Sequence, residues 1–199
     1  MTFDRNRFSQ GLTYEAYKDQ MTRNRQRLEE NERRVEIGAE DLAAFRALPR
    51  PLHVLVLAED WCGDVIANLP VLARLARESG KLDVRILLRD QNDDVMQRYL
   101  NQGKFKSIPV FVFLDEDFRE LGHWIERPAS VTELRATKRR EIFASDPSFG
   151  SPDAPVDQLP DDVRARLQER LARMRDETVP FANREVIREL RELVTRVAA

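Results

Sequence analysis

The chain has 199 residues, of which 42% are hydrophobic and 34% charged, and its formal net charge is −2. This length suits one domain, or one domain with an appendage, and the composition is that of a soluble globular protein rather than a collagen-like, mucin-like or disordered chain. The charge gives no reason to expect nucleic acid or an anionic membrane as a partner. Because no apolar run approaches the roughly 18 residues of a membrane span and the first residues lack the apolar stretch of a signal peptide, we expect a cytoplasmic protein.

The N-terminal segment, residues 1–34, is predicted to be a helical extension. From Tyr14 to Val35 apolar side chains recur at helical spacing, which predicts one long amphipathic helix with a thin apolar stripe. A seven-residue step within this stripe suggests a coiled coil, but Asn24 and Asn31 occupy the second seam. We therefore favour a helix that packs on its own domain.

Residues 35–144 alternate between strand-like and helix-like patterns. The near-continuous apolar run Leu52–Ala58 is typical of a buried strand in a parallel sheet. The order β-α-β-α-β-α-β-β-α predicts an α/β fold, a central mixed sheet with helices on both faces. The expected strands are 35–37, 52–58, 82–88, 109–114 and 120–125, and the expected helices are 40–48, 62–79, 92–100 and 131–143.

The C-terminal part divides into a linker and a helical pair. Four prolines and a glycine between residues 145 and 160 predict a linker or a surface loop, since neither helix nor ladder persists through them. Apolar stripes in residues 161–199 predict two helices joined around Val179-Pro180. Two helices of this length are not stable alone, so we expect them to dock on the main domain or to form a homodimer with a second copy.

Cys62 is the only cysteine, so one chain can form neither an internal disulfide nor a metal cluster made of cysteines. It follows a predicted buried strand and opens a predicted helix, where unpaired N–H groups and the helix dipole favour a reactive thiolate. An isolated cysteine is otherwise often buried and inert. His53 and His123 have no ligand spacing with it, and the acidic residues near Asp90 lack the pattern of a calcium loop, so we expect no metal.

Three motifs in this region resemble the thioredoxin superfamily. Trp61-Cys62-Gly63 matches the start of its Trp-Cys-Gly-Pro-Cys active site, and Pro70 falls where the family has the kinking proline of its second helix. Ser107-Ile108-Pro109 is similar to the family's cis-proline segment. The resemblance covers roughly residues 35–143 and implies a thioredoxin-like fold. More narrowly, the motif Glu59 to Asp64, with Asn68 to Val71, is similar to a bacterial subgroup of thioredoxin-like proteins.

The departures from the family pattern change the expected chemistry. Val65 stands where the family has its resolving cysteine, and Asp64 replaces the proline between the two cysteines. Val56 replaces the buried aspartate that the family uses as a proton acceptor. A dithiol cycle therefore cannot run within one molecule, and release of a mixed disulfide needs an external thiol such as glutathione.

The residues around Cys62 suggest how the site would work. The helix start lowers the thiol pKa, whereas Glu59, Asp60 and Asp64 raise it if their carboxylates lie close, so the direction stays open at this stage. The resemblance implies that the peptide bond between Ile108 and Pro109 is cis. It also implies that a substrate groove beside Cys62 is formed by four residues, Trp61, Gly63, Ile108 and Pro109.

The leading hypothesis is monothiol thiol–disulfide exchange through Cys62, with protein or small-molecule thiols and disulfides as partners. The rival hypothesis is a non-catalytic thioredoxin-fold module that binds an extended segment or dimerises. A third possibility, an iron–sulfur carrier resembling monothiol glutaredoxins, fits poorly because Asp64 and Val65 do not match that family's signature.

Overall fold

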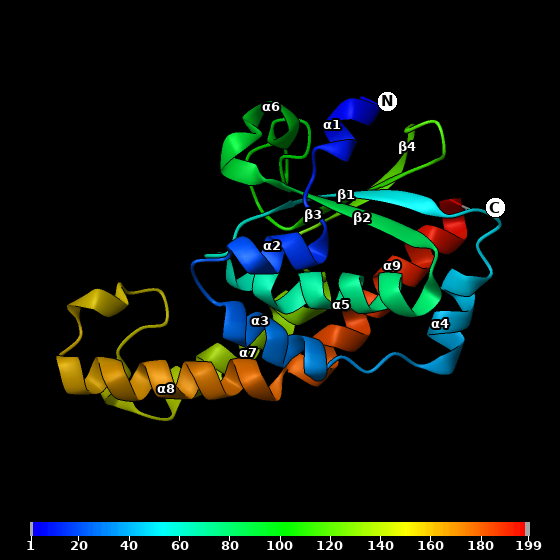
Figure 1. Ribbon diagram of the computed structural model, residues 1–199. Helices are drawn as coiled ribbons and strands as arrows, with labels where there is room; N and C mark the ends of the chain where they lie inside the picture. Colours follow the sequence, from blue (N-terminus) through cyan, green and yellow to red (C-terminus); the bar gives the residue numbers. More distant parts are fainter. Residues whose placement is uncertain (1, 198–199) are drawn as a thin grey trace. The chain divides into compact units, whose positions relative to one another are not determined.

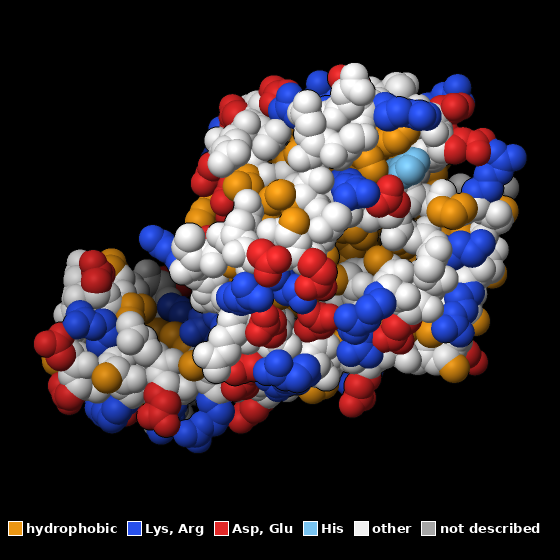
Figure 2. Space-filling model, in the orientation of Figure 1, with side chains coloured by type: hydrophobic (Ala, Val, Ile, Leu, Met, Phe, Trp, Pro, Cys, Tyr) orange, Lys and Arg blue, Asp and Glu red, His pale blue; other side chains and the backbone are white. Residues whose placement is uncertain are grey.

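The computed structural model describes residues 2–197. Its contacts divide the chain into two compact units, Met1–Arg127 together with Val186–Ala199, and Pro128–Glu185. These bounds differ from the four segments expected from the sequence, whose independence as domains stays a prediction. Acidic and basic side chains are interspersed over the face seen in Figure 2, as the near-zero net charge leads one to expect.

A four-stranded mixed sheet lies at the centre of the first unit (Figure 1). The strand order is β2-β1-β3-β4, with β1 parallel to β2 and antiparallel to β3, and β3 antiparallel to β4. All of β3 and nearly all of β1 are buried, which explains their near-continuous apolar sequences. The predicted α/β class is confirmed, and the strands are β1 Leu52–Ala58, β2 Leu82–Leu88, β3 Val110–Leu114 and β4 Glu120–Ile125.

The strand predicted at 35–37 is wrong, because these residues form an irregular segment. Val35 is apolar because it packs into the core, not because it pairs with a strand. The edge beside β2 is instead occupied by Leu12, which forms a single antiparallel bridge with Ile86 through two backbone hydrogen bonds of 2.8 Å.

Helices cover both faces of the sheet in this unit (Figure 1). The long helix α5, Gly63–Ser79, lies on one side with α3 and α4, and α1 and α6 lie on the other. The helix expected over 92–100 is much shorter, because it ends in turns after Met96. The remaining helices of this unit are α1 Arg5–Ser9, α2 Tyr14–Gln20, α3 Arg25–Arg33, α4 Ala39–Arg46 and α6 Asp93–Met96.

The single helix predicted from Tyr14 to Val35 is wrong, because the segment forms two helices, α2 and α3, with an irregular stretch between them. Asn24 takes the left-handed conformation with φ 58°, and the Asp60 carboxylate accepts hydrogen bonds from the backbone N–H groups of Thr22 and Arg23 at 2.7 and 3.0 Å. A carboxylate from a distant segment thus captures N–H groups that a continuous helix would use. The prediction that this segment packs on its own domain is confirmed, because Tyr17 and Leu28 lie in the core.

The second unit has its own small core, formed by Phe143, Phe149, Val163 and Leu167. Its main helices are α7, Ala129–Ala144, and α8, Asp161–Glu177. The proline-rich stretch between them contains two short 3₁₀ turns, Pro147–Phe149 and Val156–Gln158, and the first of them buries Phe149. The last helix, α9, is Val179–Val197, and its residues from Val186 onward belong to the first unit.

Candidate functional site

Cys62 lies where the sequence places it, between β1 and α5. It is the N-cap residue of α5, with extended backbone angles, and its carbonyl accepts the first helical hydrogen bond, from Ile66 N–H at 3.1 Å. The thiol is partly buried. Its Sγ donates to the carbonyl oxygen of Ile108 at 3.4 Å, and the Ile108–Pro109 peptide bond is cis. Two motifs distant in the sequence therefore meet at the sulfur atom.

The direction of the Cys62 pKa, left open by the sequence, is upward. Burial is the largest cause, and the charges of Asp64 and Glu126 add to it. Hydrogen bonds from the N–H groups of Val65 and Asp64 at the helix start act in the opposite direction but do not outweigh the burial. The resting thiol is therefore protonated at neutral pH, consistent with its role as a donor to Ile108.

Of the three carboxylates expected near the thiol, only Asp64 is among the groups that raise its pKa most strongly. Asp60 holds the turn between α2 and α3, and its own carbonyl accepts from the Asn24 amide at 2.8 Å. Glu59 is buried and accepts from the backbone N–H of Asp90 at 2.8 Å, and burial raises the pKa of its carboxyl group. The Asp60 and Glu59 carboxylates therefore hold neighbouring segments in place by accepting backbone hydrogen bonds, from Thr22 and Asp90 respectively.

Glu126 was missed by the sequence analysis. It lies directly after β4, far from Cys62 in the chain, so only the fold brings its charge near the sulfur. Its carboxylate and that of Asp64 share the guanidinium of Arg127, which contacts both oxygens of Asp64 at 2.9 and 2.7 Å and also pairs with Glu126. No local sequence signal marks this cluster of three side chains. We call its two acidic members, Asp64 and Glu126, the carboxylate pair.

Trp61 is one of two large hydrophobic side chains that are exposed in the part of the chain described, at 41%, and Phe105 at 50% is the other. The guanidinium of Arg89 lies over the indole ring, 4.8 Å from its centre. Arg89 also donates to the carbonyl of Lys106 at 3.2 Å. It therefore links Trp61 to the segment before the cis bond, and the exposed indole is oriented by a cation–π contact.

Gly63 is exposed, and a Cβ atom placed on it would meet no other atom within 4 Å. The chain thus leaves open space beside the thiol. Val65 and Val56, the positions of the missing cysteine and aspartate, are fully buried. Apolar packing has replaced the polar groups that the family pattern has at both positions.

Tyr17 is a second group that the sequence analysis missed, having been counted only as part of an apolar stripe. The residue is buried, and its hydroxyl has no hydrogen-bond partner among the described residues. Burial raises the pKa of this phenol strongly, and the charges of Asp60, Glu59 and Cys62 raise it further. The phenol therefore stays protonated close to the thiol site.

Neither histidine contributes to the site. His53 stacks on Phe118 with ring centres 4.4 Å apart and contacts Asp83 at 3.3 Å. His123 contacts Glu120 at 2.8 Å. Over residues 2–197 no three acidic, histidine or cysteine side chains come together in a way that could hold a metal ion.

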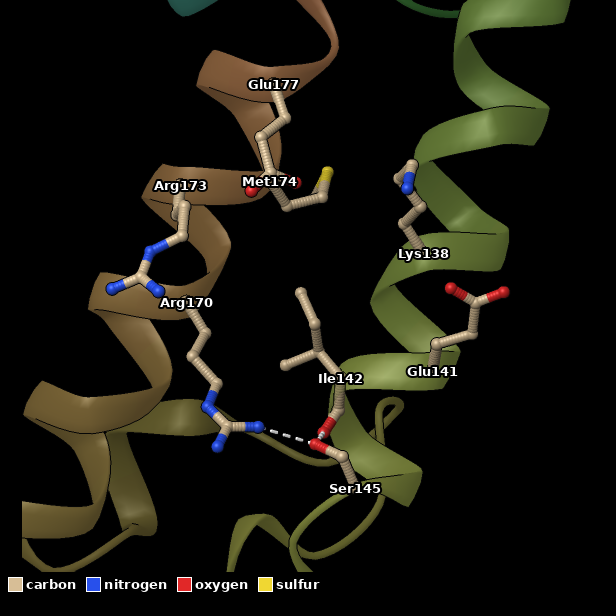
Figure 3. A pocket seen from close by; sticks show the side chains of 8 residues that line it. All are labelled: Lys138, Glu141, Ile142, Ser145, Arg170, Arg173, Met174 and Glu177. Carbon is tan, nitrogen blue, oxygen red and sulfur yellow. Dashed lines mark hydrogen bonds between the residues drawn. The ribbon is translucent and has the colours of Figure 1, made fainter.

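A pocket of about 400 Å³ lies within the second unit, between α7 and α8 (Figure 3). Ile142 and Met174 give it an apolar wall, and Arg170 donates to the Ser145 hydroxyl at 2.6 Å. Its other lining groups are of both signs, Lys138, Glu141, Arg173 and Glu177. This mixture selects no ligand class.

Comparison with known proteins agrees with the geometry. A family model described as thioredoxin matches residues 11–140, and the chain therefore belongs to the thioredoxin family. No curated protein is a significant match. The solved structures that share the fold include the following two. One is an HIV epitope scaffold, with a TM-score of 0.62 and 19% identity over 94% of both chains. The other is a protein of unknown function from Pseudomonas aeruginosa, with a TM-score of 0.60 and 18% identity over 89% of this chain and 99% of that one.

Proposed function

We propose that this thioredoxin-like protein carries out thiol–disulfide exchange through Cys62 alone, with an external thiol such as glutathione completing the cycle. The observation that carries the proposal is the position of the sulfur, partly exposed and 3.4 Å from the Ile108 carbonyl, directly before the cis bond. An extended partner segment could form main-chain hydrogen bonds with the backbone of Ile108, as an added β-strand does. A cysteine in that segment would then lie next to Cys62.

The exchange has two steps, and each conserves atoms and electrons. The Cys62 thiolate first attacks one sulfur of a partner disulfide, so that a mixed disulfide forms while the old S–S bond breaks and its electron pair leaves with the second sulfur. That sulfur takes up the proton that Cys62 lost. An external thiolate then attacks the partner sulfur of the mixed disulfide, and Cys62 leaves as a thiolate.

The raised pKa of Cys62 sets the expected rate. Because only the thiolate attacks, a thiol that is mostly protonated at neutral pH reacts slowly, and its rate rises with pH. Classical dithiol reduction of insulin-type disulfides should be poor, since Val65 cannot resolve the intermediate.

A second candidate function is a non-catalytic module that binds an extended segment. The same raised pKa and the apolar residues at Val56 and Val65 favour it. The two candidates differ in the covalent adduct. A Cys62→Ser variant of a binding module keeps its partner, whereas that of an exchange protein loses the adduct.

The decisive experiment incubates the full chain with 2-hydroxyethyl disulfide at mildly alkaline pH and measures intact mass. Exchange predicts one adduct per chain, which added glutathione removes and which Cys62→Ser never forms. Because Cys62 is the only cysteine, the adduct needs no mapping. A native protein that stays unmodified while the urea-unfolded chain is modified would leave only the binding module.

The remaining expectations are also proposals: a cytoplasmic location, protein or small-molecule thiols and disulfides as partners, and a homodimer through the terminal helices. No helix within residues 2–197 combines the length and apolar character needed to cross a bilayer.

A further inference from the structure

A pocket of about 330 Å³ lies in the first unit, lined by residues of α1, β1, β2 and the turn before β4. His53 and Asp83 are paired in the register of β1 and β2, and Arg85 follows on the same face because side chains alternate along a strand. His53 is near the start of β1 and Cys62 follows its end, so the strand keeps the pocket more than about 15 Å from the thiol. The pocket is therefore distinct from the site around Cys62 and the carboxylate pair.

The charged side chains that line this pocket carry an excess of positive charge. Arg5 reaches it from α1 and Arg85 from β2, whereas Asp83 is the one carboxylate of the lining. The two oxygens of that carboxylate lie 3.4 Å from Nε of Arg85 and 3.3 Å from Nδ1 of His53. The guanidinium of Arg5 lies 5.1 Å from the centre of the Phe118 ring and has no acidic partner among the described residues. Arg5 thus brings N–H donors to the pocket that the described chain does not use.

The N-terminal segment that carries Arg5 is anchored on both sides of the pocket. The N–H of Phe3 donates to the Phe118 carbonyl at 2.8 Å, and Leu12 forms its bridge with β2. Gly11 lies so close to Arg85 that a Cβ atom placed on it would be 2.8 Å from the Arg85 Cβ. The segment around α1 is therefore held against the strands, and the two arginines line a cavity that is formed without a ligand.

Three aromatic rings form the apolar part of the pocket, and we call Phe8, His53 and Phe118 the aromatic wall. The rings of His53 and Phe118 are stacked with centres 4.4 Å apart, and the ring of Phe8 meets both of them edge-on. Phe118 has a left-handed backbone with φ 61°, which is unfavourable for a bulky side chain. Guanidinium donors beside an apolar aromatic surface are the composition of a small-molecule site.

We propose that this pocket binds a small aromatic oxyanion, with its carboxylate or phosphate group beside Arg5 and Arg85 and its ring against the aromatic wall. A guanidinium forms paired, charge-assisted hydrogen bonds with either kind of oxyanion. The ring of the ligand packs against the wall through offset or edge-to-face contacts. This binding site does not depend on the exchange chemistry of Cys62.

The test titrates the full chain, labelled with ¹⁵N, at constant ionic strength and follows the backbone amide signals of the lining residues by NMR. Benzoate and phenyl phosphate carry both features of the proposed ligand and should shift these signals until they saturate. Benzyl alcohol has only the ring and inorganic phosphate only the charge, so each should bind at least about tenfold more weakly than phenyl phosphate. Benzylamine, an aromatic cation, should not bind.

Two substitutions should change the affinity for the anionic probes in opposite directions. Arg5→Gln should weaken the binding of benzoate and phenyl phosphate about tenfold, because a charge-assisted hydrogen bond is lost. Asp83→Asn should strengthen it, because the carboxylate that repels an anion is removed. The matched control is Arg27→Gln, since Arg27 is an exposed arginine on α3 that does not line this pocket, and it should keep the wild-type affinity.

The outcomes either support or overturn the proposal. Shifts that saturate with neither anionic probe would refute the site. Benzylamine that binds as tightly as benzoate would overturn the proposed charge preference, because Asp83 would then outweigh the two arginines. Wild-type affinity of Arg5→Gln for both anions would remove Arg5 from the site and refute the proposal. Arg5 is exposed, so this variant should keep the amide spectrum of the folded protein, and Asp83→Asn tests the charge preference independently of it.

Discussion

Pro70 lies inside α5 and has no N–H to donate to the carbonyl of Ile66, one turn earlier. Asn31 on α3 supplies the missing donor, with its side-chain nitrogen 2.9 Å from that oxygen in a buried contact. Asn31→Ala removes this hydrogen bond and leaves a buried carbonyl unpaired. We expect the free energy of unfolding to fall by about 2 kcal/mol, within the range of roughly 1–3 kcal/mol for an unsatisfied buried polar group.

A double-mutant cycle tests this explanation. In a Pro70→Ala background the new N–H of residue 70 can pair with Ile66, so Asn31→Ala should cost about 1 kcal/mol less there than in the wild type. The free energies come from urea unfolding followed by circular dichroism. Gln26→Ala is the control on α3, because its exposed bond to Glu30 should contribute under about 0.5 kcal/mol. Equal costs of Asn31→Ala in both backgrounds would refute the reasoning.

Three further predictions concern the segments that hold the site in place. Asp60→Ala should lower the free energy of unfolding by about 1–2 kcal/mol, because Thr22 and Arg23 lose their acceptor; an unchanged urea midpoint would contradict this. Gly11→Ala should lower the free energy of unfolding by about 1–3 kcal/mol through overpacking, since the new Cβ would lie 2.8 Å from Cβ of Arg85. A variant whose melting temperature equals that of the wild type would contradict this. Glu59→Gln keeps an oxygen for Asp90 but cannot ionise. Because burial raises the pKa of Glu59 in the folded state, its contribution to stability is present below the unfolded value of about 4.3 and is lost as pH rises through the folded value. The variant should thus gain stability over the wild type as the pH rises above about 4.3, and a gap that does not widen with pH would count against the buried acid.

The sheet could be predicted from the sequence because its signals are local. The bounds of β1, β2 and β4 agree with the prediction, and β3 begins one residue later, at Val110. Apolar runs bounded by turn residues carry this information. The break between α2 and α3 could not be predicted, since it depends on the carboxylate of Asp60, which lies 38 residues from Thr22 in the sequence.

The candidate site also contains residues that the sequence could predict and residues that it could not. The meeting of Cys62 with Ile108 and Pro109 follows from motifs that the sequence displays. Glu126, Arg127 and the phenol of Tyr17 carry no motif, because each becomes relevant only when distant segments are packed together. The direction of the Cys62 pKa depended on burial, which the sequence does not contain.

The most direct test of the account measures the alkylation rate of Cys62 by iodoacetamide across pH in the native protein. The Cys62 thiol is partly exposed, and burial raises its pKa. The rate should therefore increase steadily above neutral pH, with its midpoint above the ordinary cysteine value of about 8.5. A midpoint below that value would contradict the dominance of burial over the helix start, and a native thiol that never reacts would contradict its accessibility.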